Sequence, residues 1–285
     1  MNYTIPFTYT GHETFACRSY WLKKGYDFVN EDNHFNAPEA PSILGVGKNM
    51  VRSIRYWLKA FSLLEEDAPS ELANKLFNSS NGWDPYLEDI NTIWLLHYHL
   101  VKTSYAKIYS DLFNDFRQRQ TEFSFDNFER FLKLRLQDTS INTIKTDIAV
   151  LKNNYIRPIR KKVKIEDAFS VFLQELGLIE NVAGGYYHFN TRKKSSLSNN
   201  VLLFTILHNF HGKVSISFES LLNDSNSPGN VFCLSQEELY TRILEICNST
   251  SRIVFSEDAG IRELQIDRSL HENIYYILDQ YYNGR

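Results

Sequence analysis

The sequence predicts a mainly α fold with small β hairpins, of the α+β class, built as tandem winged-helix or helix-turn-helix-like modules around a helical middle. Three observations lead to this prediction. Only 12 glycines and 7 prolines occur in 285 residues, which argues against a loop-rich β sandwich. Hydrophobic residues make up 43% and charged residues 23%, so the chain can bury a core and need not be disordered. A pattern of a helix followed by a hairpin recurs along the chain.

Changes in composition divide the chain into four segments. We expect an N-terminal winged-helix-like module, a helical segment, a second helix-turn-helix module with a hairpin, and a C-terminal winged-helix-like module. Their expected bounds are 1–64, 65–120, 121–195 and 196–285. In the second segment, apolar residues from Leu87 to Val101 follow the spacing of a buried helix face.

Charge and cysteine content limit the classes of protein. The 31 Lys and Arg against 34 Asp and Glu give a formal charge of −3, which excludes a polybasic protein that coats nucleic acid by charge alone. Cys17, Cys233 and Cys247 are odd in number and scattered, so a disulfide framework is not expected. The N-terminus has no secretory pattern, and the longest apolar stretch is too short to span a bilayer. We therefore expect a cytoplasmic protein with no membrane contact.

A cationic helix is expected early in the chain. Gly45 and Gly47 allow a tight turn, and a helix then runs from about Lys48 to Phe61. Residues 41–64 contain four Lys or Arg and no acid. The apolar face consists of Val51, Ile54 and Leu58, with Trp57 and Phe61 beside it.

This segment resembles the turn and recognition helix of winged-helix regulators of the GntR kind, although Ser62 stands where Gly is expected and Arg55 where an apolar residue is usual. Short polar and basic side chains at the start of a recognition helix reach base edges, and cations around them bind phosphates. The residues expected at the major groove are Lys48, Asn49, Arg52 and Ser53, and those expected at phosphates are Arg55 and Lys59. The alternative is an amphipathic helix whose charged face is simply solvated.

A second helix-turn-helix candidate begins at Ser140, a plausible N-cap. The run from Thr143 to Ile148 resembles an element of DeoR-type regulators. Residues 152–164 then hold six cations and no acid, enough to neutralise several phosphates. The residues expected to contact nucleic acid here are Thr143, Lys145, Arg160, Lys161 and Lys162. An exposed basic linker is the alternative.

The fourth segment has a different charge. Ser235 to Glu238 form a capping-box pattern before an apolar helix face, and residues 253–266 read as a hairpin. Residues 231–285 hold nine acids against five Lys or Arg. An acidic wing suits a protein partner better than DNA, so we expect partner docking or a possible homodimer here.

The segment from Gly11 to Phe15 combines a histidine with a carboxylate. It has three interpretations. In the first, its role is structural, and His12 and Glu13 satisfy backbone groups at the start of the helix that leads to Trp21. In the second, both residues form a polar partner site with Arg18, and in the third they carry out acid–base chemistry. The spacing of histidines and cysteines fits no common metal motif, so neither a metal nor another cofactor is predicted.

Several strings together resemble domain-of-unknown-function family 4007. They are Thr10 to Phe15, Trp21 to Gly25, Leu44 to Trp57, Trp83 to Asp89, Ile93 to His97 and Ser227 to Gly229. The resemblance implies a bacterial protein encoded in defence islands, near enzymes like phosphoadenosine-phosphosulfate reductase that belong to DNA phosphorothioation or related anti-phage systems. It implies no established catalytic activity.

Two functional hypotheses follow. The first is a non-enzymatic, winged-helix DNA-binding protein that recognises duplex DNA or recruits partners to it. The second is an assembly adaptor that docks a sulfurtransferase-like or ATPase partner without touching DNA. Since winged-helix folds serve both purposes, the arrangement of the cations has to discriminate between them.

Overall fold

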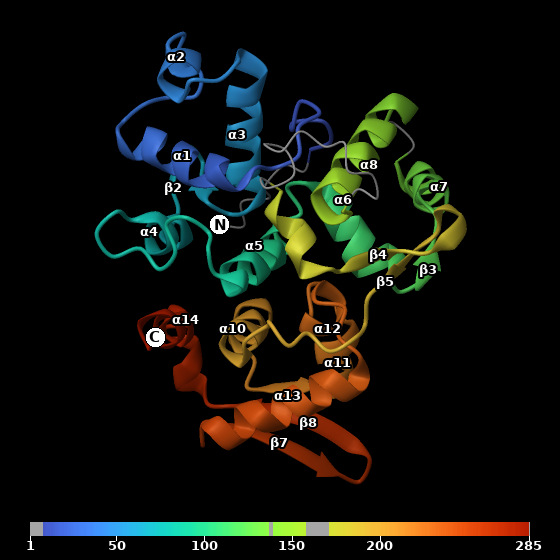
Figure 1. Ribbon diagram of the computed structural model, residues 1–285. Coiled ribbons are helices and arrows are strands. Elements are labelled where there is room, and N and C mark those ends of the chain that lie inside the picture. The colour runs from blue at the N-terminus through green and yellow to red at the C-terminus, as the bar shows by residue number, and fades with distance from the viewer. Residues whose placement is uncertain (1–7, 137–138, 158–170, 285) are drawn as a thin grey trace.

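A computed structural model describes residues 8–136, 139–157 and 171–284 (Figure 1). Its first elements are three helices and a minimal hairpin: α1 (Ser19–Asn30), α2 (Ala40–Leu44), α3 (Lys48–Ala60), β1 (Leu64–Glu65) and β2 (Ala68–Pro69). The predicted cationic helix is therefore confirmed to within one residue. Gly45 ends α2 in the left-handed region, with φ of 60°, which explains the glycine at that turn.

The helical middle follows directly. It contains α4 (Glu71–Phe77), α5 (Ile90–Lys102), α6 (Lys107–Ser110) and a π-helical turn over Asp111–Phe116. Helix α5 is buried on nearly all sides, because eleven consecutive residues from Asn91 to Val101 are buried. Such a helix belongs at the centre of the molecule rather than on its surface.

The third part pairs two helices with a small sheet. Its elements are β3 (Glu122–Phe123), α7 (Phe125–Arg135), α8 (Ile141–Tyr155), a 3-10 turn over Phe172–Leu176, β4 (Ile179–Asn181) and β5 (Tyr187–Phe189). The predicted cap at Ser140 is confirmed, because its side chain accepts a hydrogen bond from the backbone N–H three residues on, and Ser124 caps α7 in the same way. Strands β4 and β5 form the hairpin expected in this segment, and β3 adds an unpredicted third strand.

The C-terminal part surrounds a second three-stranded sheet. It comprises α10 (Asn199–Asn209), β6 (Ser215–Ser217), α11 (Phe218–Asn223), α12 (Pro228–Val231), α13 (Gln236–Ser249), β7 (Ile253–Asp258), β8 (Ile261–Ile266) and α14 (Tyr275–Asn283). The strand order is β6-β8-β7, so the predicted hairpin is confirmed and β6 is the addition. The capping box is half right: Ser235 caps α13, but Glu238 bonds Arg242 and the backbone of Lys194 instead of its own N-cap.

A buried joint connects the middle of the molecule to the C-terminal part. The ring of His97 lies between the Tyr155 hydroxyl (2.6 Å) and the Val231 carbonyl (2.8 Å). Asn114 and Asn226 add a second pair of hydrogen bonds across the same boundary. Helices with small antiparallel sheets confirm the α+β class, while the winged-helix identity of the modules and the bounds of the four segments stay predictions. Over the described ranges, every helix is too short or too polar to cross a bilayer.

Candidate nucleic-acid interface

The N-terminal half of α3 presents polar side chains to solvent. Lys48 and Asn49 are exposed in the first turn, and the Arg52 side chain is 57% exposed one turn later. The opposite face of the helix is buried through Val51 and Ile54. The N-cap residue is a glycine and offers no side-chain acceptor to the first N–H groups. This end of α3 therefore combines two cations with the positive end of the helix dipole.

Ser53 does not belong to this surface, so the prediction that it meets the major groove is wrong. The residue is fully buried, and its hydroxyl has no hydrogen-bond partner within the described ranges. The helical repeat explains the burial, because Ser53 lies one turn before Trp57, which is itself completely buried. That spacing was the signal in the sequence that could have identified Ser53 as a core residue.

Arg55 and Lys59 are neutralised by one carboxylate. Asp67, in the β1–β2 hairpin, accepts hydrogen bonds from both nitrogens of the Arg55 fork (2.9 and 2.7 Å), and Lys59 Nζ lies 3.2 Å from it. Partial burial acts to raise the pKa of Asp67, but the hydrogen bonds from Arg55 and Lys59 outweigh burial and lower it. The expectation that both cations are free for phosphates therefore does not hold, because both are already paired with Asp67.

Arg52 is held more loosely. Its Nη1 lies 3.3 Å from Glu13 Oε1, in a single contact between partly exposed side chains. Exposed ion pairs of this kind contribute about 0–1 kcal/mol, so a phosphate or a guanine edge could displace Glu13. Among the six α3 residues predicted to bind DNA, the available set is thus Lys48, Asn49 and Arg52.

The second predicted contact region is only partly described. Lys145 is exposed on the first turns of α8, and the Thr143 hydroxyl is bonded to Ser140 at the helix start (2.8 Å). Thr143 therefore takes part in capping the helix. The predicted contacts at Arg160, Lys161 and Lys162 lie outside the described residues.

His12 connects the segment before α1 to α8. Its Nε2 donates to Asp147 Oδ1 at 2.8 Å, and its Nδ1 accepts the Thr14 N–H at 3.2 Å, which assigns the neutral ring with the proton on Nε2. The same carboxylate oxygen accepts the Thr10 N–H. The ring also stacks on Trp57 of α3, so one buried side chain joins α3, α8 and the segment before α1.

This geometry separates the three residues that the sequence grouped. His12 bonds a carboxylate 135 positions away, Glu13 turns to Arg52, and Arg18 lies over Trp21 and bonds Tyr20. As the structural interpretation expects, His12 accepts a backbone N–H, that of Thr14, and its other partner is the side chain of Asp147.

A second buried carboxylate, that of Asp111, lies near the contact between His12 and Asp147. Asp111 accepts the Tyr9 hydroxyl at 2.9 Å and pairs with Lys107 at 2.9 Å. Burial, followed by the charge of Asp111 and then of Asp147, raises the pKa of Tyr9 well above its usual value. Within the described ranges, His, Cys, Asp and Glu side chains form no group of three placed to hold a metal ion.

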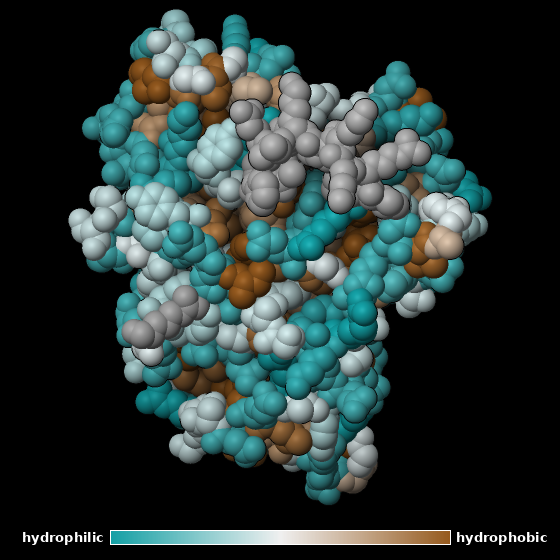
Figure 2. Space-filling view, viewed as in Figure 1, coloured by the Kyte–Doolittle hydropathy of each residue, from teal (hydrophilic) through white to brown (hydrophobic). Residues whose placement is uncertain are grey.

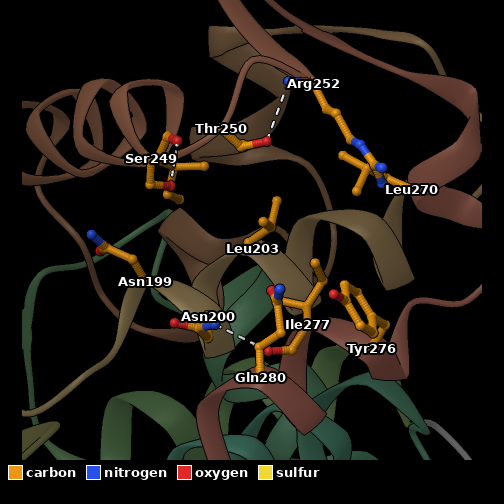
Figure 3. Close-up of a pocket in the computed structure, with 11 residues that line it drawn as sticks. Asn199, Asn200, Leu203, Ser249, Thr250, Arg252, Leu270, Tyr276, Ile277 and Gln280 are labelled. Atoms are coloured by element: carbon orange, nitrogen blue, oxygen red, sulfur yellow. Dashed lines mark hydrogen bonds between the residues drawn. The ribbon is translucent and has the colours of Figure 1, made fainter. Parts of the chain in front are cut away.

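A separate pocket of about 270 Å³ opens between α10, α13 and α14 (Figure 3). Leu203, Ile246 and Ile277 give it apolar walls, while amide and hydroxyl groups surround them. Several of those groups already bond one another or the backbone; the Asn200 amide, for example, donates to the Ile277 carbonyl at 3.0 Å. Those of the predicted DNA-binding residues that the structure describes lie on other elements, α3 and α8.

The comparisons with known proteins agree with the family inferred from the sequence. A family model described as "Protein of unknown function (DUF4007)" matches residues 9–282. The chain belongs to this family. Two solved structures of a protein called SspB are similar to it, each aligned over 97% of this chain and 88% of the other. One has a TM-score of 0.86 at 26% identity; the other, a magnesium ion-bound form of SspB, has a TM-score of 0.85 at 25% identity. No curated protein matches the chain.

Asp67 and Asp147, which bind the side chains of predicted site residues, were not identified from the sequence. Asp67 follows the cationic helix in a short turn, which is a natural place for a counter-ion to that helix. Asp147 is an acid within an otherwise apolar helical face, between Ile144 and Ile148 and four residues before Leu151. An acid on a buried helix face needs a partner, and that signal could have directed attention to His12.

Proposed function

We propose that the protein binds duplex DNA through the N-terminal half of α3, as a non-enzymatic accessory protein of a bacterial anti-phage or DNA-modification system. The observation that supports this is the exposed group of Lys48, Asn49 and Arg52 at the positive end of a helix whose other face is buried. Asn pairs well with adenine and Arg with guanine in the major groove, while Lys suits phosphate. This proposal assigns base contacts to Asn49 and Arg52 and a phosphate contact to Lys48.

The proposed setting comes from the family. The chain belongs to the DUF4007 family, and the setting that the family resemblance implies is a role in the cytoplasm beside enzymes of DNA phosphorothioation, including a phosphoadenosine-phosphosulfate-reductase-like partner. In that setting the α3 end recruits the partner to DNA or recognises the duplex itself.

The direct test is DNA binding by fluorescence anisotropy over a range of salt concentrations. We expect Lys48→Ala/Arg52→Ala to weaken binding by about 10- to 100-fold and to lower the slope of log affinity against log salt by about two. The matched control is Lys213→Ala/Arg252→Ala, which removes the same charge from exposed positions in the C-terminal part. Parental affinity in the α3 variant would exclude this surface from DNA binding.

An assembly adaptor is the second candidate, and the pairing of Arg55 and Lys59 with Asp67 favours it. Because two of the four cations of α3 are paired with an acid of the adjacent hairpin, fewer positive charges remain for phosphates. The adaptor predicts no retention on DNA at physiological salt. It also predicts co-purification with a sulfurtransferase-like or ATPase partner on co-expression, so the two candidates separate in one set of measurements.

A further inference from the structure

The sheet β6-β8-β7 has one covered face and one open face. Its register pairs Val254 with Gln265, Ser256 with Glu263 and Asp258 with Ile261, so these residues share a face. Ser215 and Ser217 of β6 pair with Gln265 and Glu263 and continue that face. The alternate residues of these strands point to the opposite face and are buried against the helices. They include Ile216, Ile253, Leu264 and Ile266. We call the first set the outer face of the sheet.

The outer face combines exposed aliphatic groups with acids. Val254 is 52% and Ile261 66% exposed, high values for β-branched side chains in regular strands. The acids are Asp258 and Glu263. The outer-face set contains no Lys or Arg: Arg262 belongs to the other face, where it stacks over the Phe218 ring at 4.5 Å. Figure 2 shows hydrophobic side chains beside hydrophilic ones at this end of the molecule.

Glu263 is held in place as an anion. Ser215 Oγ and Gln265 Nε2 both donate to its carboxylate, at 2.6 and 2.7 Å. These hydrogen bonds, with that from Ser215 the stronger influence, lower the pKa of Glu263. A fixed negative charge therefore lies on the central strand of the outer face at neutral pH.

The charge of the outer face decides among its potential occupants. Duplex DNA is repelled by Asp258 and Glu263. A second copy of the chain, packed face to face, would bring these carboxylates against like charges, which is destabilising. The occupant has to neutralise the acids and cover the aliphatic groups. A cationic protein surface does both, because Lys and Arg pair with the acids while aliphatic side chains cover Val254 and Ile261.

We propose that the outer face of β6-β8-β7 docks a protein partner whose contact surface alternates Lys or Arg with aliphatic side chains. This inference rests on the adaptor role, and it extends that role by naming the surface and the chemistry of the partner. It also replaces the homodimer expected for this segment with a heterotypic contact.

The test uses fluorescein-labelled heptapeptides and the full chain. An alternating lysine–valine peptide is the probe, with lysine–serine and glutamate–valine peptides as comparisons. We expect the lysine–valine peptide to bind, the lysine–serine peptide to bind at least 3-fold more weakly, and the glutamate–valine peptide not to bind. Asp258→Lys/Glu263→Lys should weaken the lysine–valine complex by at least 10-fold, and Val254→Ser/Ile261→Ser by at least 3-fold.

The controls separate this site from other acids and from misfolding. Glu245→Lys/Glu272→Lys changes charge equally on exposed acids outside the sheet and should leave peptide affinity within 2-fold of the parent. In the unmodified chain, peptide should shift the NMR methyl signals of Val254 and Ile261, a readout that needs no variant. Equal affinity of the parent and the charge-reversed chain, or unshifted methyl signals, would overturn the proposal. Co-purification of a partner despite that result would keep the adaptor role and reject only this surface.

Discussion

The α3 end and the β6-β8-β7 end of the molecule follow the same order of a helix and then a hairpin, yet they present opposite chemistry. At the α3 end, Lys48 and Arg52 project from the helix, and the hairpin supplies the acid, Asp67. At the other end, the hairpin surface is acidic and aliphatic, and Arg262 is turned inward. The comparison shows that the order of elements does not determine what a module binds, because the exposed side chains differ.

The two ends also depend on different supports. The α3 end is joined to α8 through the buried bond between His12 and Asp147, whereas the outer face rests on the core beneath its own sheet. A change to one support should therefore leave the other end intact, and the first of four predictions tests this.

The largest expected effect is at Asp147. Asp147→Ala leaves His12 Nε2–H and the Thr10 N–H without their acceptor in a buried site, and we expect a loss of about 3 kcal/mol in unfolding free energy. DNA affinity should fall, and lysine–valine peptide binding should persist. Urea unfolding and the two binding assays measure this. Asp147→Asn, which keeps the Oδ1 acceptor, should cost clearly less; equal losses would place the cause outside these hydrogen bonds.

The joint between the ends should respond to pH. Burial lowers the pKa of His97 from 6.5 to about 4, and its hydrogen bond to the Val231 carbonyl offsets only part of this. As pH falls, His97 is therefore protonated in the unfolded chain before it is protonated in the folded one. The contribution of His97 to the unfolding free energy is complete above pH 6.5, and about 3 kcal/mol of it is lost as pH falls toward 4. Urea unfolding from pH 7 to 4.5 should show a shallower fall for His97→Gln than for the exposed control His34→Gln. An unchanged slope in His97→Gln would contradict the assignment.

Much of the fold follows from local patterns in the sequence. The start of α3, the cap at Ser140 and the β7–β8 hairpin were all predictable, because each depends on residues that are close in the chain. Strands β3 and β6 were not predicted, since each is two or three residues long and exists through pairing with a distant strand.

The site was predictable only in part for the same reason. The exposure of Lys48 and Asn49 follows from helix periodicity, and the burial of Ser53 follows from it too. The neutralisation of Arg55 by Asp67 depends on the fold of the hairpin, and the partner of His12 lies 135 residues away. Contacts over such distances leave no periodic trace in a single sequence.

The next prediction tests the hairpin acid at the α3 end. Asp67→Asn removes the charge that holds Arg55 and Lys59, so DNA affinity at low salt should rise by about 10-fold, or 1.4 kcal/mol, with a steeper salt dependence. The control is Glu65→Gln, which makes the same charge change at an exposed position of the same hairpin. If both variants bind DNA like the parent, the two released cations do not face the duplex, and the adaptor gains support.

The smallest expected effect concerns Glu13. Glu13→Gln weakens a single exposed contact to Arg52, so DNA affinity should rise by about 2- to 3-fold and stability should change by less than about 0.5 kcal/mol. Anisotropy titrations in parallel with Glu31→Gln, another exposed acid, would measure it. A decrease in affinity would mean that Glu13 orients Arg52 rather than competing for it.

The position of His97 has a further consequence. Its ring is fixed at once to α8, through Tyr155, and to α12, through the Val231 carbonyl, in the interior of the protein. Whatever is bound at either extremity is then held at a set spacing and angle from what is bound at the other. The protein would hold its two ends at a fixed distance and angle, and His97 shares that task with the hydrogen bonds between Asn114 and Asn226.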